Sequence, residues 1–168
     1  MEGVVCGIDP GLGVTGYAVL RVEGAQLIVV DAGVCRFDEH PPLAKRLVQV
    51  ERDVSSILSE HQPEVVAVEE LYSHYKHPRT AILMGHARGV ILCAAARRGI
   101  EVRSFAATRI KRYLTGNGRA TKAQVQRAVQ TALGLPEFPD PPDVADALAI
   151  AMCCAAEMGR AKPVEVSV

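Results

Sequence analysis

The spacing of apolar positions divides the chain into an opening group of strands followed by alternating helices and strands. Three runs rich in β-branched residues come first, with turn residues between them, as is typical of an antiparallel meander. Their expected bounds are 4–9, 14–22 and 26–37. The first run is apolar without alternation, which predicts a central strand buried on both faces.

Beyond position 40 the apolar spacing changes to that of a helix. Residues 41–61 form an amphipathic stripe, with Pro42 suited to the first helical turn. Further strands are expected at 64–69 and 100–105, and further helices at 78–98, 108–114, 121–133 and 143–158. Strands first and alternation afterwards predict an α/β fold with a mixed five-stranded sheet and helices on both faces.

Length and composition indicate one ordinary folded domain. With 168 residues, 49% hydrophobic and 23% charged, the chain is long enough to bury a core without disulfide or metal support. We interpret residues 1–168 as a single domain with a flexible tail from about residue 160. No apolar run approaches the roughly 18 residues that span a bilayer, and no secretory leader precedes the first strand. We therefore expect a cytoplasmic protein with no membrane association.

The five cysteines favour neither disulfides nor zinc. Five is an odd number, and no CxxC pair occurs among Cys6, Cys35, Cys93, Cys153 and Cys154. All five lie in apolar stretches, so we expect them to be reduced and buried.

The zero net charge conceals a segregation of the two signs. Positions 71–136 hold twelve basic residues and one acid, Glu101, a net charge of +11, whereas the rest of the chain carries −11. Such asymmetry indicates a surface that faces a polyanion. The alternative is that folding mixes the charges over the surface.

Four acids stand at the ends of elements predicted to be buried. Asp9 and Glu69 each end an apolar strand, where open α/β sheets place their sites. Asp143 and Asp146 are three apart and share one face of an apolar, alanine-rich helix. Clustered carboxylates stay ionised only with strong compensation, and basic residues are scarce in these segments. Mg²⁺ prefers carboxylate and phosphate oxygens, so the pattern indicates metal-dependent phosphodiester chemistry.

Each acid also has an ordinary structural interpretation. Asp9 precedes Pro-Gly and suits a turn, and Asp143 follows two prolines and suits a helix cap. Periodicity alone does not choose between Glu69 and Glu70, which face opposite ways on a strand. Asp146, one turn inside an apolar helix, is the hardest to explain structurally.

A dinucleotide fingerprint is present but lacks its context. Residues 11–16 match GxGxxG directly after a strand. That fingerprint needs a helix to follow, whose amino terminus holds the pyrophosphate. Here β-branched residues follow, so we expect a returning strand and regard the match as chance.

Five segments, in order along nearly the whole chain, resemble the RuvC family of crossover junction endodeoxyribonucleases. They are GIDPG at 7–11, VTGY at 14–17, VAVE at 66–69, GHARG at 85–89 and DVADALAIA at 143–151. The resemblance implies a ribonuclease H-like fold and a homodimer that resolves four-way (Holliday) DNA junctions by symmetric cuts in homologous recombination and DNA repair. It also implies two Mg²⁺ per active site, with Mn²⁺ as a substitute, 5′-phosphate and 3′-hydroxyl ends, and the RuvA–RuvB branch-migration complex as partner.

The same resemblance assigns residues. Asp9, Glu69, Asp143 and Asp146 match the catalytic, metal-binding acids, and the match selects Glu69 over Glu70. Some family members carry histidine in place of Asp143. The DNA contacts implied are an aromatic ring that approaches junction bases and basic residues that hold phosphates: Tyr72, Lys111 and Lys122, with Arg112 and Arg119 as companions. Residues 73–79 form a polar, basic loop suited to the junction surface.

Two other functions share some of these features. The segment 9–16 also resembles the first phosphate loop of actin-like and sugar-kinase ATPases, but those enclose the nucleotide between two such domains, which this length does not supply. A non-catalytic binder of DNA structures would gain nothing from four acids beside phosphates.

Overall fold

The sheet places the amino-terminal apolar run at its centre. The computed structural model describes residues 2–72 and 77–159, in which five strands form one mixed sheet in the order β3-β2-β1-β4-β5. The strands are β1 (Glu2–Asp9), β2 (Val14–Glu23), β3 (Gln26–Arg36), β4 (Val65–Glu69) and β5 (Glu101–Phe105). The first three pair antiparallel, whereas β1–β4 and β4–β5 are parallel. The predicted fold class and the opening meander are therefore confirmed.

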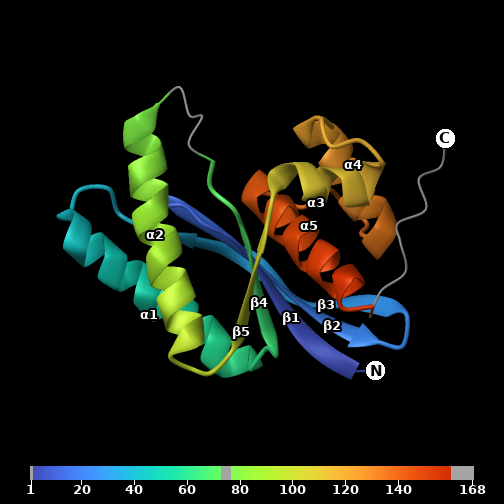
Figure 1. Ribbon diagram of the computed structural model, residues 1–168, viewed down its shortest axis with the longest axis horizontal. Helices are drawn as coiled ribbons and strands as arrows, with labels where there is room; N and C mark the ends of the chain where they lie inside the picture. Colours follow the sequence, from blue (N-terminus) through green and yellow to red (C-terminus); the bar gives the residue numbers. More distant parts are fainter. Residues whose placement is uncertain (1, 73–76, 160–168) are drawn as a thin grey trace.

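Helices cover both faces of the sheet, as predicted (Figure 1). One face carries α1 (Leu43–His61) and α2 (Pro78–Ala96); the other carries α3 (Ala107–Thr115), α4 (Lys122–Leu133) and α5 (Pro142–Glu157). The observed ends lie within two residues of the expected ones. Pro42 is the N-cap residue of α1 and not part of its first turn, which corrects the expected start at residue 41. The tail expected from about residue 160 lies outside the described residues.

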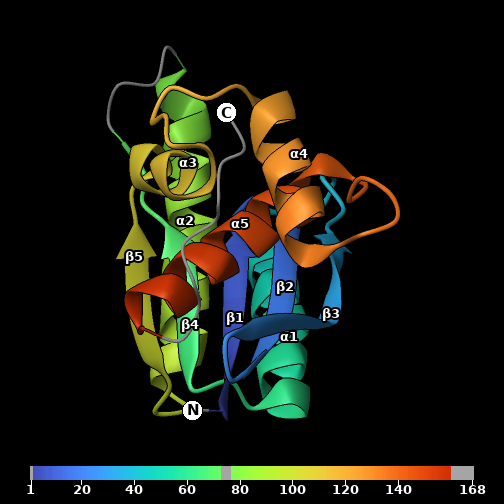
Figure 2. The ribbon, with the colours of Figure 1, turned by 90° about the vertical axis from the view of Figure 1, so that its right-hand side faces the viewer.

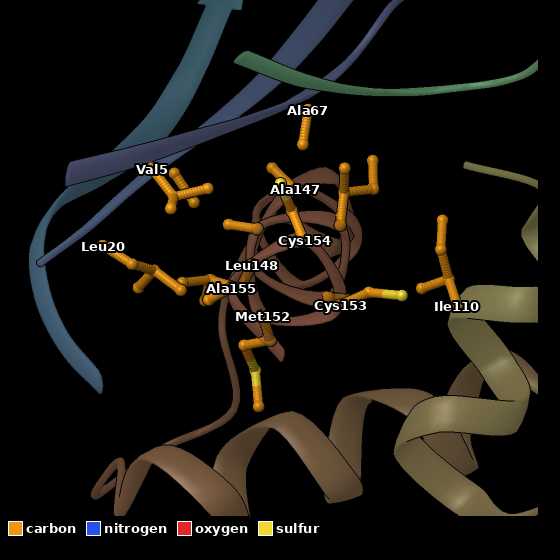
Figure 3. Packing of buried hydrophobic residues seen from close by; sticks show 14 of the residues in the cluster. Val5, Leu20, Ala67, Ile110, Ala147, Leu148, Met152, Cys153, Cys154 and Ala155 are labelled. Carbon is orange, nitrogen blue, oxygen red and sulfur yellow. The ribbon is translucent and has the colours of Figure 1, made fainter. Parts of the chain in front are cut away.

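The central helix of the fold is α5. Figure 2 shows it crossing in front of the strands, with α3 and α4 above it in this view. Its buried residues run unbroken from Ala147 to Ala155, and the apolar side chains of β1, β4 and α3 point toward it (Figure 3). The alanines and cysteines that predicted a core-packed helix are small enough to fit between the sheet and a second helical layer.

Two glycines let α5 lie directly on the sheet. A Cβ atom at Gly7 of β1 would stand 2.3 Å from the carbonyl oxygen of Ala147, and one at Gly16 of β2 would stand 2.2 Å from that of Asp143. No side chain fits at either position without moving the helix. These two glycines belong to the segments GIDPG and VTGY, so part of what those motifs encode is the seating of α5.

The turn after β1 confirms that the GxGxxG match is chance. Residues 14–23 form β2, antiparallel to β1, and no helix begins there. The turn is closed by Thr15, whose buried hydroxyl donates to the Gly11 carbonyl oxygen at 2.7 Å and accepts from the Gly11 amide at 3.2 Å. Thr15, and not the carboxylate of Asp9, therefore stabilises this turn.

Two expectations about burial need correction. All five cysteines are free thiols, but Cys93 is exposed on α2 and Cys35 is only half-buried. The same face of α2 is open at Gly89, where an added Cβ atom would have nothing within 4 Å. Cys93 is exposed because the face of α2 that carries it points away from the sheet. Within the described residues, every helix is too short or too polar to cross a membrane.

Candidate active site

The carboxyl ends of two parallel strands deliver two acids to one side of the sheet. The β1–β4 ladder ends at the pair Ile8–Val68, so Asp9 and Glu69 each lie one residue beyond it. Alternation puts Asp9 on the α5 side with Val5, and Glu69 on that side with Ala67. Of the two adjacent acids, Glu69 is the one that faces α5.

The amino-terminal part of α5 supplies the other two acids. Its N-cap is Pro141 and no side chain caps the helix, so Asp143 lies inside the first turn and is not a cap. A carboxylate there is favoured by the helix dipole. Asp146 follows one turn later with 28% of its side chain exposed. The contact between the Asp143 main chain and Gly16, which pairs with Asp9, brings this end of α5 to the end of β1.

Asp9, Glu69 and Asp146 line one cleft of about 280 Å³. The cleft also contains two lysines, Lys111 of α3 and Lys122 of α4. The rest of its lining is apolar: Met84, Ala107, Ile110, Val125, Ala149 and Ile150. Asp143 is not part of this lining, although its charge acts on its neighbours. A larger hollow of about 490 Å³ is lined by residues 58–59, 62–64 and 98–100, with Glu64 as its one acid.

Burial and mutual repulsion raise the pKa values of the three lining acids. The pKa of Asp9 rises to about 8, first because of burial and then because of Asp146, Glu69 and Asp143. Burial followed by the charge of Asp146 raises the pKa of Glu69. Burial also raises the pKa of Asp146, against the lowering effect of Lys122. The fold therefore gathers like charges that oppose the ionisation of these carboxylates, of Asp9 most of all.

The two lysines partly offset this repulsion. Lys122 Nζ lies 3.7 Å from Asp146 Oδ2, and Lys111 and Lys122 both lower the pKa of Glu69. The scarcity of basic residues noted in the acidic segments therefore does not hold for the folded site. The resemblance assigned both lysines to phosphates and did not show that they share the cleft with the acids or that Lys122 pairs with Asp146, because these segments are distant in the chain.

The donor set suits a hard divalent cation, since carboxylate oxygens are the ligands that Mg²⁺ and Mn²⁺ prefer. In residues 2–72 and 77–159, no three His, Cys, Asp or Glu side chains are arranged to hold a metal ion as they stand. Coordination would therefore require the carboxylates of the cleft to turn toward a common point. With Lys122 80% exposed, its ammonium group is free to move away from Asp146 as they do so.

The remaining predicted DNA contacts with described positions, Tyr72, Arg112 and Arg119, do not line the cleft. Arg112 and Arg119 are exposed next to the turn at 116–118, where Asn117 Oδ1 accepts from the Arg119 amide at 2.9 Å. Tyr72 is 48% exposed, three residues past Glu69. Of the basic loop at 73–79, residues 73–76 lie outside the described residues. Folding does not leave every basic residue available: Arg109 pairs with Glu157 and lies over the ring of Phe105.

Arg88 is a residue whose role sequence reasoning missed. Its Nε donates to the main-chain carbonyl of Glu69 at 3.0 Å, and its Nη2 donates to Ser104 Oγ at 2.6 Å. The motif GHARG at 85–89 marked this arginine as part of the resemblance. A contact from a helix to the end of a strand has no signature in the sequence.

The sheet order, the helices on both faces and the acidic cleft at the carboxyl ends of β1 and β4 define a ribonuclease H-like α/β protein. The family model of crossover junction endodeoxyribonuclease RuvC matches residues 5–154. The chain belongs to the RuvC family.

Relatives and solved structures agree with this assignment. The RuvC of Rhodopirellula baltica is 49% identical over 89% of this chain and 84% of its own length, and that of Heliobacterium modesticaldum is 44% identical over 90% and 93%. The structure of Thermus thermophilus RuvC in complex with a Holliday junction substrate superposes with a TM-score of 0.86 at 38% identity, covering 96% of this chain and 99% of that one.

Proposed function

We propose that this protein is a Holliday junction resolvase: a Mg²⁺-dependent endodeoxyribonuclease that cuts four-way DNA junctions in recombination and repair. The observation that carries the proposal is the convergence of Asp9, Glu69 and Asp146 in one cleft with two lysines, in a chain of the RuvC family. The relative with 38% identity is a RuvC in complex with a Holliday junction substrate. We also propose that residues 1–168 act as one domain in the cytoplasm.

In this proposal the four acids Asp9, Glu69, Asp143 and Asp146 hold two Mg²⁺ ions, for which Mn²⁺ can substitute. Such an ion pair stabilises the attacking and leaving oxygens of phosphodiester hydrolysis, and the products carry 5′-phosphate and 3′-hydroxyl ends. The raised pKa values of the lining acids support this role, because a bound cation favours the ionised carboxylates.

The chain's own cationic residues have a separate task. Lys111 and Lys122 share the cleft with the acids, so a phosphate held by them would lie next to the metal ligands. Arg112 and Arg119 would extend this contact along the DNA backbone, where charge supplies most of the affinity. Tyr72, exposed beyond β4, would stack on a base at the junction.

We further propose a homodimer that works with the RuvA–RuvB branch-migration complex. Two cleavage sites are needed for paired cuts, which a symmetric dimer supplies. The outer face of α2 and the neighbouring α1 surface are our candidate for the interface. A groove on this face is lined by residues that include Val48, Glu51, Cys93 and Arg97. The same face exposes Ile82 and Gly89.

The test is a cleavage assay on a synthetic four-way junction and a linear duplex of the same sequence, with Mg²⁺ and with EDTA. We expect paired, symmetric nicks in the junction with Mg²⁺ only, and ligatable 5′-phosphate ends. Glu69→Gln is the inactive control. Equal cleavage of the linear duplex, or cleavage in EDTA, would contradict the proposal.

The dimer has its own test, which is the molar mass in solution. We expect Gly89→Arg to convert a dimer into a monomer, because the large charged side chain meets open space in one chain but a partner in the dimer. An Ala132→Arg variant, at an exposed position of α4, controls for the added charge. A dimer that persists in Gly89→Arg would place the interface elsewhere.

A further inference from the structure

Glu69, the last residue of β4, has different surroundings on the two faces of the sheet. On one face the Glu69 side chain enters the cleft. On the opposite face α2 packs against the sheet, and Arg88 reaches from it to the main-chain carbonyl of Glu69, with Nε at 3.0 Å from the oxygen. The side chain proposed to hold a metal ion and the arginine that holds its backbone thus meet at one residue.

This contact lies where β4 loses one of its two neighbours. The β1–β4 ladder ends at Ile8–Val68, one residue short of Glu69. Pairing with β5 continues, since Glu69 is opposite Phe105 and the Glu70 amide donates to the Phe105 carbonyl at 2.9 Å. Just beyond the end of the β1–β4 ladder, the Glu69 carbonyl accepts a hydrogen bond from Arg88.

The same guanidinium group also connects β4 to β5. Its Nη2 donates to the hydroxyl of Ser104 at 2.6 Å, so one planar group holds two adjacent strand ends. Arginine is permanently protonated and presents its donors in a rigid plane, which fixes two acceptors relative to each other better than a lysine could. Holding the Glu69 carbonyl restrains the plane of the Glu69–Glu70 peptide, and so the position of the Glu69 Cα from which the side chain starts.

We propose that Arg88 is a positioning residue that sets the direction of the Glu69 carboxylate toward the metal site. The inference rests on the proposed function, in which Glu69 is a metal ligand. Residues that orient metal ligands without touching the metal commonly change metal affinity by about 10–100-fold when they are removed. Arg88 acts in this way through a main-chain carbonyl.

The first experiment measures Mn²⁺ binding to the full chain by titration calorimetry, without DNA. We expect Arg88→Ala to weaken Mn²⁺ affinity about tenfold and Arg88→Lys, which keeps one donor, to recover part of the loss. The matched control is Arg98→Ala, because Arg98 also donates to a main-chain carbonyl, that of Ala94 at 3.0 Å, far from the cleft. We expect the control to bind Mn²⁺ like the wild type.

A double-variant comparison separates positioning of Glu69 from a general effect on the fold. In a Glu69→Gln background, Arg88→Ala should weaken Mn²⁺ binding no further. In an Asp146→Asn background it should still weaken binding about tenfold. Equal effects of Arg88→Ala in both backgrounds would overturn the inference.

Hydrogen exchange provides a readout that needs no metal. We expect faster amide exchange at the carboxyl end of β4 in Arg88→Ala and not in Arg98→Ala, and a smaller change in Ser104→Ala, which leaves the bond to Glu69 intact. If the wild type binds Mn²⁺ and cuts junctions while Arg88→Ala binds Mn²⁺ equally well, the role of Arg88 fails and the proposed function stands. If the wild type neither binds Mn²⁺ nor cuts, the proposed function fails. Unchanged amide exchange in Arg88→Ala would show that the hydrogen bond from Arg88 to the Glu69 carbonyl does not hold the end of β4.

Discussion

The two faces of the sheet are covered by helices that pack in different ways. On one face, α5 buries eleven of its sixteen residues and lies so close to β1 and β2 that only glycine fits beneath it. On the other face, α1 buries three residues and α2 four, each out of nineteen, and both expose an outer surface. The closely packed face carries the acids, and the open face carries our candidate for the dimer interface.

The carboxylates on the two faces show what this difference means. On the α1 face, Asp31 accepts from Tyr17 Oη at 3.2 Å and lies 3.0 Å from His61 Nε2, so its charge has ordinary partners. On the α5 face, Asp9 has three other acids as neighbours. Carboxylates that repel one another stay close together only when the elements that carry them are held in place. The end of α5, the helix with the most buried residues, provides such a position.

The largest expected effect is on junction cleavage, and it distinguishes Asp146 on the α5 face from Asp31 on the α1 face. We expect Asp146→Asn to lower junction cleavage by at least about 10³-fold, equivalent to about 4 kcal/mol in the transition state, because it removes a proposed metal ligand. Binding of the uncut junction should be unchanged or tighter, since one negative charge has gone. The measurements are single-turnover cleavage and junction binding in EDTA.

Asp31→Asn is the matched variant on the other face. It should leave cleavage within about threefold and lower the free energy of unfolding by about 1 kcal/mol, the usual contribution of one hydrogen bond. If Asp146→Asn retained cleavage, Asp146 would not belong to the metal site.

The next effect tests the close approach of α5. We expect Gly7→Ala to lower the free energy of unfolding by about 3 kcal/mol, because its Cβ would meet the Ala147 carbonyl at 2.3 Å. Gly89→Ala, in the open face of α2, should instead gain up to about 1 kcal/mol from helix propensity. Urea unfolding of both variants measures the contrast. A Gly7→Ala protein as stable as the wild type would show that α5 can be seated without this glycine.

A smaller effect concerns the stability of the metal-free protein as a function of pH. Because the pKa of Asp9 is about 8 against an ordinary 3.8, the folded state holds a proton that the unfolded state releases over this range. The free energy of unfolding therefore falls as the pH rises from about 4 to 8.

Asp9→Asn removes this loss. In EDTA at pH 8 we expect the variant to be about 1–3 kcal/mol more stable than the wild type, and the difference to disappear below about pH 4. Adding Mg²⁺ should stabilise the wild type and not the variant. Thermal unfolding across pH checks this, and equal pH profiles for the two proteins would contradict a repulsive cluster around Asp9.

The smallest effect compares one cation from each face. We expect Lys122→Ala to weaken junction binding several-fold and to reduce the slope of log affinity against log salt by about one. Arg52→Ala removes an exposed arginine of α1 that pairs with Asp53, and should leave that slope unchanged. Binding titrations at several salt concentrations give both slopes. An unaltered slope for Lys122→Ala would mean that Lys122 serves Asp146 alone.

Much of the architecture could be predicted because it depends on local pattern. The apolar run at 4–9 became the central strand, and the alanine-rich helix after Pro142 became the buried one, since hydrophobic periodicity reports directly which face is buried. The incorrect expectations concern surroundings that no local pattern contains. The exposure of Cys93 depends on which side of α2 faces the sheet, and the N-cap position of Pro141 removes the capping role considered for Asp143.

By itself, the amino-acid sequence determined the order of the elements, the family and the identity of the four candidate acids, because motif and periodicity are properties of neighbouring residues. Only the tertiary structure decided that Lys111 and Lys122 share the cleft with those acids, that Gly7 and Gly16 seat α5, and that Arg88 holds the backbone of Glu69. These are contacts between segments distant in the chain. Their energies depend on distances of a few ångströms, which exist only once the sheet and helices have packed.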